Sequence, residues 1–237
     1  MARINKHDLP GRLLKRTFFE APVEHVAPLL LGKLLIHNTR AGVMAGRIVE
    51  VEAYLGPHHQ TPDPAAHSHR GPTPRNQVMF GPPGHAYVYA IYGRYYCMNV
   101  TCEPQGQAGC ILVRALEPLA GLEQMARNRG LAKRAHPRLL TSGPGRLCQA
   151  MALTRAGHNG LDLLDPASPL QVRDDGCLVK SAHVTVRIGI RHAADLPLRF
   201  AIPGNPNVSG AKNIPATCIF LNPGSVLKMN QSPSPIP

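Results

Sequence analysis

The 237-residue sequence predicts an α+β fold, a single mixed domain with a curved, mostly antiparallel sheet, a protruding β-hairpin and flanking helices. Three observations support this prediction. The hydrophobic content of 43% is that of a globular protein. Segments with strand-like patterns recur along the chain, and two of them are joined by a tight turn. No internal repeat and no clear linker divides the sequence, so one domain is expected.

The first half of the chain contains a predicted helix followed by strands. Residues 21–31 have apolar residues at helical spacing, and Gly32 is a suitable end for that helix. Residues 33–37 and 47–54 are predicted strands. Alternation in the second strand predicts two faces, one with Val49, Val51 and Ala53 and the other with Ile48, Glu50, Glu52 and Tyr54.

The middle of the chain combines a long loop with a hairpin. Residues 56–84 are rich in Pro, Gly and His and have no periodicity, and a loop of this length within a domain is more often functional than accidental. Residues 86–92 and 95–101 have strand patterns and are joined at Gly93–Arg94, which predicts a β-hairpin. Alternation places Tyr87, Tyr89 and Ile91 on one face of it.

The remaining predicted elements complete the sheet and its helical cover. They are a strand over residues 110–116, helices over 119–128 and, capped by Ser142, through 147–153, and strands over 184–190 and 198–202. Residues 1–17 are polar and basic and are expected to form a flexible arm. Residues 222–237 are rich in Pro, Ser and Asn, so a disordered tail is expected there.

Positive charge dominates the chain, with 26 Lys and Arg against 14 Asp and Glu, a formal net charge of +12 and a pI of about 9.9. A polyanionic partner, nucleic acid above all, would explain this balance, and a generally basic protein is the alternative. The six cysteines form no C-x-x-C pair, so reduced core thiols are expected. No segment has the pattern of a signal peptide or a bilayer span, which predicts a soluble intracellular protein with no membrane partner.

All six tyrosines lie between Tyr54 and Tyr96. Planar rings beside a carboxylate on a cationic chain suggest a site that stacks a flat ligand, such as a nucleobase, and performs acid–base chemistry on it. Glu52 is the candidate general base, because a carboxylate in a pocket with little water can take a proton from a positioned water. Arg114 interrupts an apolar strand and is costly there unless paired, so Glu52 is its predicted partner. The alternatives are ordinary strand tyrosines, a solvated edge strand and a structural ion pair.

Five histidines lie between residues 58 and 85, but none forms an H-x-x-x-H pair and no cysteine pair is near, so no metal site is expected. His67 is better interpreted as a pocket wall or a hydrogen-bond donor. Tyr92, beside the predicted turn, could wedge between the base steps of a duplex or fold back on its own sheet. No lysine lies between Lys33 and Lys133, which favours an activated water over Schiff-base chemistry.

Colinear motifs across residues 20–210 resemble the alkyladenine DNA glycosylase family, also called 3-methyladenine or methylpurine DNA glycosylases. The motifs are RIVEVEAYLGP (47–57), AAHS (65–68), TPRN (73–76), YVYAIYGRYYCMN (87–99), CILVRALEPLAGLEQM (110–125), SGPGRLCQA (142–150) and LRFAIPGNPNVS (198–209). On this resemblance, residues 18–221 are a glycosylase-like catalytic domain.

The resemblance implies a monofunctional DNA glycosylase of base excision repair. Such an enzyme flips alkylated or deaminated purines, of the class of 3-methyladenine, 7-methylguanine, hypoxanthine and ethenoadenine, out of double-stranded DNA. It then hydrolyses the N-glycosidic bond with a Glu-activated water. The resemblance also implies no cofactor and no metal, and a monomer in the bacterial cytoplasm at the nucleoid, or in the nucleus of a eukaryote. A non-catalytic damaged-DNA or RNA binding module is the alternative.

The resemblance assigns roles to individual residues. Glu52 would activate the water, and Arg114 and the main-chain carbonyl of Val208 would help to hold it. The walls around the flipped base would be Tyr54, His67 and Tyr89, and Asn99 would crowd the two-amino group of guanine.

At the DNA surface, Tyr92 matches the wedge that fills the vacated stack. The candidate contacts to the DNA backbone are Arg75, Arg94 and Arg146. Two departures from the family pattern leave the substrate range open: Arg94 replaces an apolar residue, and the loop over residues 100–109, directly after Asn99, is longer.

Overall fold

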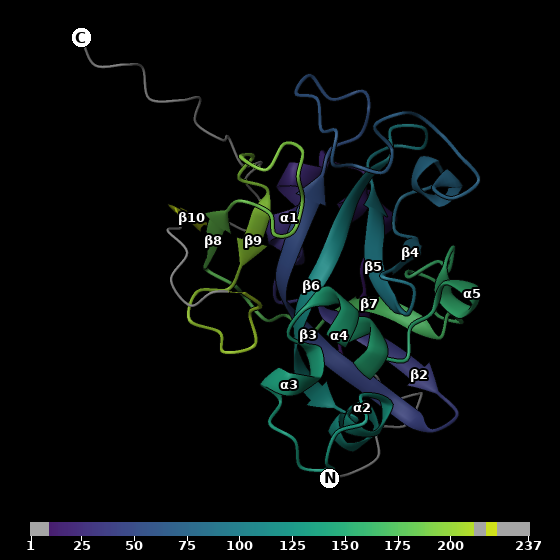
Figure 1. Cartoon of the computed structure of the whole chain (residues 1–237), viewed down its shortest axis with the longest axis vertical. Coiled ribbons are helices and arrows are strands. Elements are labelled where there is room, and N and C mark those ends of the chain that lie inside the picture. The colour runs from purple at the N-terminus through teal and green to yellow at the C-terminus, as the bar shows by residue number, and fades with distance from the viewer. Residues whose placement is uncertain (1–9, 211–216, 222–237) are drawn as a thin grey trace.

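The computed structural model describes residues 10–210 and 217–221, and these residues form one α+β domain (Figure 1). A curled sheet of ten strands runs through this part of the chain, and every strand pair in it is antiparallel. The predicted fold class is therefore confirmed. The strands are β1 Arg12–Leu13, β2 Leu34–Thr39, β3 Gly42–Tyr54, β4 Ala86–Ile91, β5 Tyr95–Cys102, β6 Gly109–Ala120, β7 Leu170–Asp174, β8 Ser181–Thr185, β9 Arg199–Ala201 and β10 Thr217–Phe220.

Short helices surround the sheet and close the main core. They are α1 Val23–Leu30, α2 Leu122–Asn128, α3 Arg138–Thr141, α4 Pro144–Ala150 and α5 Arg155–His158, with 3-10 turns at Arg16–Phe19 and Gln77–Phe80. Helix α1 packs against β3 and β6, and α4 packs against β5 and β6. Fully buried side chains such as Phe19, Leu30 and Leu147 fill the space between these layers.

Strand β3 is the centre of the sheet, whose main path runs β1-β7-β2-β3-β6-β5-β4. At thirteen residues it is long enough to pair with β2 along its first half and with β9 along its second, while β6 pairs along its other edge. The second half of β3 is therefore covered on both edges. Polar side chains there lie inside the protein and need partners within it.

A β-bulge shifts the two faces of β3. In the pairing with β6, Ile48 is opposite Leu116 and Glu50 is opposite Ala115, so Val49 is the extra residue. Because a bulge reverses the alternation on one side of it, Ile48 joins Val51 in the main core. The face predicted for Ile48 was therefore wrong, while Glu50, Glu52 and Tyr54 keep the common face that alternation predicts.

The predicted hairpin is present as β4 and β5. Tyr92 and Gly93 at its tip have positive φ values of 48° and 71°. Such a φ is uncommon for a residue other than glycine, so the tip holds Tyr92 in an unusual backbone conformation. Its side chain is 87% exposed. The hairpin therefore presents an aromatic ring to solvent rather than folding it onto its own sheet.

Several element boundaries differ from the sequence predictions. Strand β6 continues to Ala120, and Gly121 in the left-handed region (φ 73°) separates it from α2, so the helix predicted from residue 119 begins three residues later. The strand predicted over residues 184–190 ends at Thr185. Helix α4 is preceded by Gly143, and the hydroxyl of Ser142 donates to a carbonyl instead of capping the helix.

The predicted N-terminal arm is ordered over its described part. Arg12 and Leu13 pair with β7, and Arg16 donates to Asp162, so residues 10–17 lie against the sheet. The rest of the arm, residues 1–9, and the predicted tail, residues 222–237, lie outside the described residues. Among the helices described, none has the length and apolar character needed to cross a membrane.

Candidate active site

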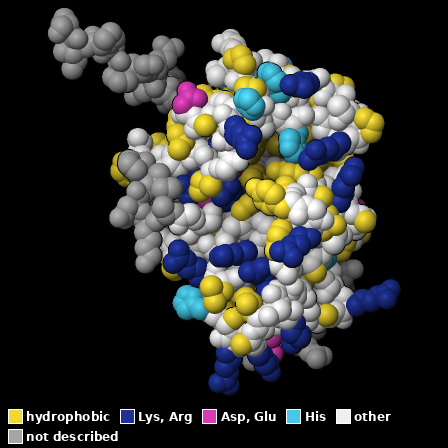
Figure 2. Space-filling model, viewed as in Figure 1, with side chains coloured by type: hydrophobic (Ala, Val, Ile, Leu, Met, Phe, Trp, Pro, Cys, Tyr) yellow, Lys and Arg dark blue, Asp and Glu magenta, His cyan; other side chains and the backbone are white. Residues whose placement is uncertain are grey.

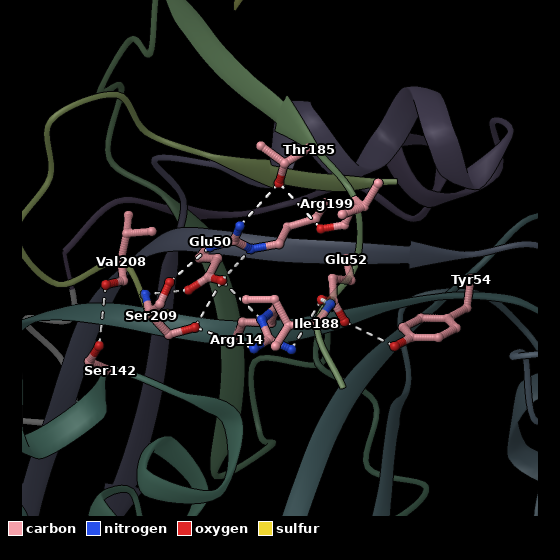
Figure 3. Close-up of polar contacts among 11 residues, drawn as sticks. Glu50, Glu52, Tyr54, Arg114, Ser142, Thr185, Ile188, Arg199, Val208 and Ser209 are labelled. Atoms are coloured by element: carbon pink, nitrogen blue, oxygen red, sulfur yellow. Dashed lines mark hydrogen bonds and ion pairs between the residues drawn. The ribbon is translucent and has the colours of Figure 1, made fainter. Parts of the chain in front are cut away.

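Two buried carboxylates on β3 meet an arginine from β6 (Figure 3). Glu50 and Glu52 are both 0% exposed, and Arg114 is almost fully buried. Arg114 donates from Nε to Oε1 of Glu50 at 2.9 Å, and its Nη1 lies 3.1 Å from Oε1 of Glu52. The pairing predicted for Arg114 is present, and it includes a second carboxylate that sequence reasoning left unassigned.

Glu50 is held on both oxygens by groups of the protein. Its Oε1 accepts from Arg114, from Nε of Arg199 at 2.7 Å and from the hydroxyl of Ser209 at 2.9 Å. Its Oε2 accepts from the amide of Ser209 at 2.6 Å. With four donors around it, this carboxylate ties three segments of the protein together.

Glu52 has a different environment. Its Oε1 accepts from the amide of Ile188 at 2.8 Å and faces Arg114, whereas its Oε2 accepts from the hydroxyl of Tyr54 at 2.9 Å. Among the described residues, Tyr54 gives Oε2 its one hydrogen bond. A carboxylate oxygen has two lone pairs, so Oε2 can accept one further proton donor on the side of the tyrosines.

Arg114 remains charged in this setting. Burial opposes its charge, but the negative charges of Glu52 and Glu50 outweigh that cost and raise the pKa of the guanidinium above its ordinary value. Arg114 therefore contributes one positive charge between the two buried carboxylates.

Aromatic side chains converge on the Tyr54 side of Glu52. Tyr54 and Tyr89 pack against one buried cluster that includes Met79 and Tyr87. The His67 ring lies 4.5 Å from that of Tyr89, and its Nδ1 lies 2.8 Å from the Tyr87 hydroxyl. The three side chains predicted as pocket walls thus come together from the end of β3, from the long loop and from β4.

The polar groups of this aromatic cluster are neutral near pH 7. Burial raises the pKa of Tyr87 to about 12 and raises those of Tyr54 and Tyr89 further. Burial, reinforced by the charge of Arg75, lowers the pKa of His67. The cluster therefore offers flat surfaces and neutral hydrogen-bonding groups, a composition that suits a planar heterocycle.

Asn99 and Val208 contact different parts of the site. Asn99 is buried on β5, where its Nδ2 donates to the Tyr87 carbonyl at 3.1 Å. The carbonyl of Val208 accepts from the hydroxyl of Ser142 at 3.4 Å, and the next residue, Ser209, contacts both Glu50 and Arg114. Val208 is thus near the carboxylates, and Asn99 is held by a hydrogen bond to Tyr87 of the aromatic cluster.

Basic side chains surround this region. Figure 2 shows a hollow lined by hydrophobic side chains, with Lys and Arg around its rim. Arg75 lies at the aromatic cluster, with Cζ 5.6 Å from the centroid of the Tyr89 ring. Arg94 lies 5.1 Å from the Tyr95 ring at the hairpin, and Arg146 is exposed on α4. All three arginines predicted to contact a DNA backbone are therefore on the surface.

Sequence reasoning assigned no role to five residues that build the site. They are Glu50, Asp63, Tyr87, Arg187 and Arg199. Arg187 and Arg199 could have been found, because each interrupts an apolar run, VTVRIGI and LRFAI, as Arg114 interrupts CILVRAL. Tyr87 shares a strand face with Tyr89, and Glu50 shares one with Glu52. No local pattern indicates Asp63.

No group of three His, Cys, Asp or Glu side chains suited to hold a metal occurs within residues 10–210 and 217–221.

The fold and site define a class, a basic α+β enzyme that sets a buried carboxylate beside a cluster of aromatic side chains. The family model described as methylpurine-DNA glycosylase (MPG) matches residues 17–206. A protein of Koribacter versatilis named "Putative 3-methyladenine DNA glycosylase" is 52% identical over 199 residues, which are 84% of this chain and 94% of that protein. Proteins with the same name from Burkholderia cenocepacia and Methanoculleus marisnigri are each 48% identical, covering 85% and 83% of this chain and 93% and 98% of their own.

The chain therefore belongs to the methylpurine-DNA glycosylase family. This confirms the resemblance seen in its motifs. The protein is a DNA glycosylase of the 3-methyladenine or methylpurine type, and its substrate is DNA.

Proposed function

We propose that this glycosylase hydrolyses the N-glycosidic bond of alkylated and deaminated purines with a water activated by Glu52. The observation that carries the proposal is the contrast between the two buried carboxylates. The partners of Glu50 are Arg114, Arg199 and Ser209, whereas Oε2 of Glu52 accepts from Tyr54 and lies on the side of the aromatic cluster. Of the two, Glu52 is therefore the better candidate to receive a proton from a water bound beside that cluster.

The proposed reaction needs only a water, the nucleotide and the carboxylate of Glu52. The water oxygen bonds to C1′ of the sugar, the N-glycosidic bond breaks, and its electron pair leaves with the purine. The water proton passes to Glu52. Positive charge develops on the sugar as the bond breaks, and the ionised carboxylate stabilises it in a region shielded from solvent. Arg114 pairs with Glu52 on the side of Oε1, and the Val208 carbonyl is a further candidate acceptor for the water.

The aromatic cluster supplies the proposed base site. Tyr54, His67 and Tyr89 would stack against a flipped purine of the class of 3-methyladenine, 7-methylguanine, hypoxanthine or ethenoadenine. Alkylation at N3 or N7 already makes the purine a good leaving group, and a damaged base costs less to extrude from the duplex. Asn99 lies next to this cluster, where it would restrict a purine that carries a two-amino group.

The rim supplies the proposed DNA contacts. Tyr92, exposed at the hairpin tip, would fill the gap in the stack that the flipped nucleotide leaves. Arg75, Arg94 and Arg146 would neutralise phosphates on either side of it. We infer a monofunctional enzyme, since the sequence places no lysine between Lys33 and Lys133 to act as an amine nucleophile.

An excision assay with two matched variants tests the proposal. Duplexes carrying one lesion each are incubated with the enzyme, and alkali then cleaves the abasic strands. Glu52→Gln keeps the shape of the side chain and removes the base, so base release should fall by about 10²–10⁴-fold while lesion binding persists. In Glu50→Gln the main loss should be in stability, because two guanidiniums lose a buried partner. Near-normal release by folded Glu52→Gln would overturn the role of Glu52.

The same assay separates hydrolysis from other chemistries. The proposal expects release to persist in EDTA, to leave the strand unbroken before alkali, and to give no protein–DNA crosslink with borohydride. A borohydride crosslink would indicate an amine nucleophile, and loss of release on chelation would indicate a metal. Either result would replace the activated-water mechanism.

A further inference from the structure

A second buried ion pair lies behind the aromatic cluster. Arg187 and Asp63 have side chains that are 0% exposed, and the guanidinium donates from Nη1 to Oδ2 at 2.6 Å and from Nη2 to Oδ1 at 2.8 Å. Two-point pairs of this kind fix both distance and orientation. A buried ion pair seldom stabilises a fold more than apolar packing would. The fixed geometry of this pair is therefore a better guide to its role than its contribution to stability.

Asp63 also accepts hydrogen bonds from two backbone amides near the pocket walls. Its Oδ2 accepts from the amide of Leu55 at 3.0 Å, directly after β3, and its Oδ1 accepts from the amide of Ala65 at 3.2 Å. Ala65 begins the AAHS motif that carries His67. One carboxylate therefore ties the end of β3 to the segment that positions the His67 ring.

Arg187 contacts β3 from the other side of the pair. Its Nη1 donates to the Ala53 carbonyl at 3.1 Å, and its Cζ lies 4.6 Å from the centroid of the Tyr54 ring. A guanidinium over an aromatic face is attracted by the negative charge of the ring face, and more strongly where water is excluded. The Tyr54 ring is thus held on its face by Arg187 and at its hydroxyl by Glu52.

The residue after Arg187, Ile188, contacts the carboxylate of Glu52. The amide of Ile188 donates to Oε1 of Glu52 at 2.8 Å (Figure 3). Residues 187–188 therefore contact three parts of the site. Arg187 pairs with Asp63 on the loop that carries His67 and lies over the Tyr54 ring, and Ile188 donates to Glu52.

We propose that Arg187, paired with Asp63, is a positioning residue that sets the two pocket walls Tyr54 and His67 at a fixed distance from Glu52. This inference rests on the proposed roles of Glu52 and Tyr54. Arg187 acts through other residues and does not touch the reacting atoms. Losing its two-point contact should let the walls shift relative to the carboxylate, and displacements of about 1 Å can cost about 10²-fold in rate.

The test uses Arg187→Lys, which keeps the positive charge but loses the two-point contact, and Asp63→Asn, whose single amide oxygen can still accept from one of the two backbone amides, that of Leu55 or that of Ala65. The control is Arg47→Lys, because Arg47 makes a two-point contact with Asp175, at 3.0 and 2.8 Å, in the part of β3 that pairs with β2, where both side chains are partly exposed. Two quantities are measured. One is the rate constant and amplitude of base release in a single turnover, and the other is the ratio of affinities for lesion and undamaged duplexes.

Both site variants should lower the rate constant by about 10- to 100-fold and lower the affinity ratio, with little change in binding to undamaged DNA. The control should match the wild type. A merely structural role would reduce the amplitude in proportion to the folded fraction while the rate constant and the ratio stay unchanged, and that result would overturn the proposal. If Arg187→Lys does not fold, the same two measurements on Asp63→Asn test the role of the pair. If the wild type releases no purine, the proposed function fails, and the role of Arg187 is then tested by the affinity ratio alone.

Discussion

The guanidinium of Arg114 lies 3.1 Å from the carboxylate of Glu52, with both side chains inside the protein. The register of the sheet accounts for this contact. Leu112 is opposite Glu52 and Ala115 is opposite Glu50, so Arg114 lies between the two carboxylates and reaches both. One arginine therefore pairs with both a structural carboxylate and the candidate catalytic one.

Replacing Arg114 by Met should destabilise the protein strongly. The change leaves Glu52 without its cation and Glu50 with one arginine instead of two, and breaking a buried pair costs about 3–5 kcal/mol. Urea denaturation followed by circular dichroism measures the free energy of unfolding. The control is Arg146→Met on the exposed face of α4, which should stay within about 0.5 kcal/mol of the wild type. An unfolding free energy for Arg114→Met equal to that of the control would show that the pair contributes nothing.

Tyr92→Ala should impair base flipping more than chemistry. The exposed ring at the hairpin tip would stack in the gap left by an extruded nucleotide, a contribution of about 1–3 kcal/mol per ring contact. Single-turnover release from a well-paired duplex should therefore fall strongly, and release from a single-stranded or mismatched substrate should fall less. Tyr92→Phe keeps the ring and should resemble the wild type. Equal losses on both kinds of substrate would place Tyr92 outside the wedge role.

Lesion affinity should fall steeply with salt. A chain with a net charge of +12 binds DNA largely by neutralising phosphates, which releases condensed ions. Binding is measured over a salt series, and the slope of log affinity against log salt counts the contacts. Arg94→Gln and Arg146→Gln should each reduce that slope by about 1. A slope unaltered in either variant would remove that arginine from the DNA contacts.

Stability should fall as the pH drops from about 7 to 5, in part through His37 and His158. Their Nε2 atoms lie 3.2 Å apart, and burial is the main cause that lowers the pKa of each. The unfolded histidines titrate near 6.5, so below that pH the unfolded chain binds protons that the folded chain does not. The contribution of the two histidines to the free energy of unfolding is present above about pH 6.5, and it is lost as the pH falls through their pKa values in the folded protein.

His37→Gln should flatten this dependence, and urea denaturation at each pH measures it. The paired carboxyl of Asp175 has its pKa lowered to about 2 by its hydrogen bond with Arg47, so its contribution is lost in a separate, more acidic range. An identical pH dependence in wild type and variant between pH 7 and 5 would show that the histidine pair does not contribute.

The sequence by itself determined the local parts of the site. Alternation put Glu52 and Tyr54 on one face of β3, the Gly93–Arg94 turn located the hairpin, and a lone charge in an apolar run identified Arg114 as buried and paired. These features could be predicted because each depends on a few neighbouring residues. The motif resemblance extended them to a family that the comparisons then confirmed.

Only the tertiary structure decided which carboxylate contacts the aromatic cluster and what holds the side chains of that cluster. Arg199 reaches Glu50 across 149 positions of the sequence, and Arg187 reaches Asp63 across 124. The bulge that places Ile48 in the core is likewise a property of the pairing between β3 and β6. Contacts over such separations arise when the sheet closes and buries the charges together, so no short window of sequence contains them.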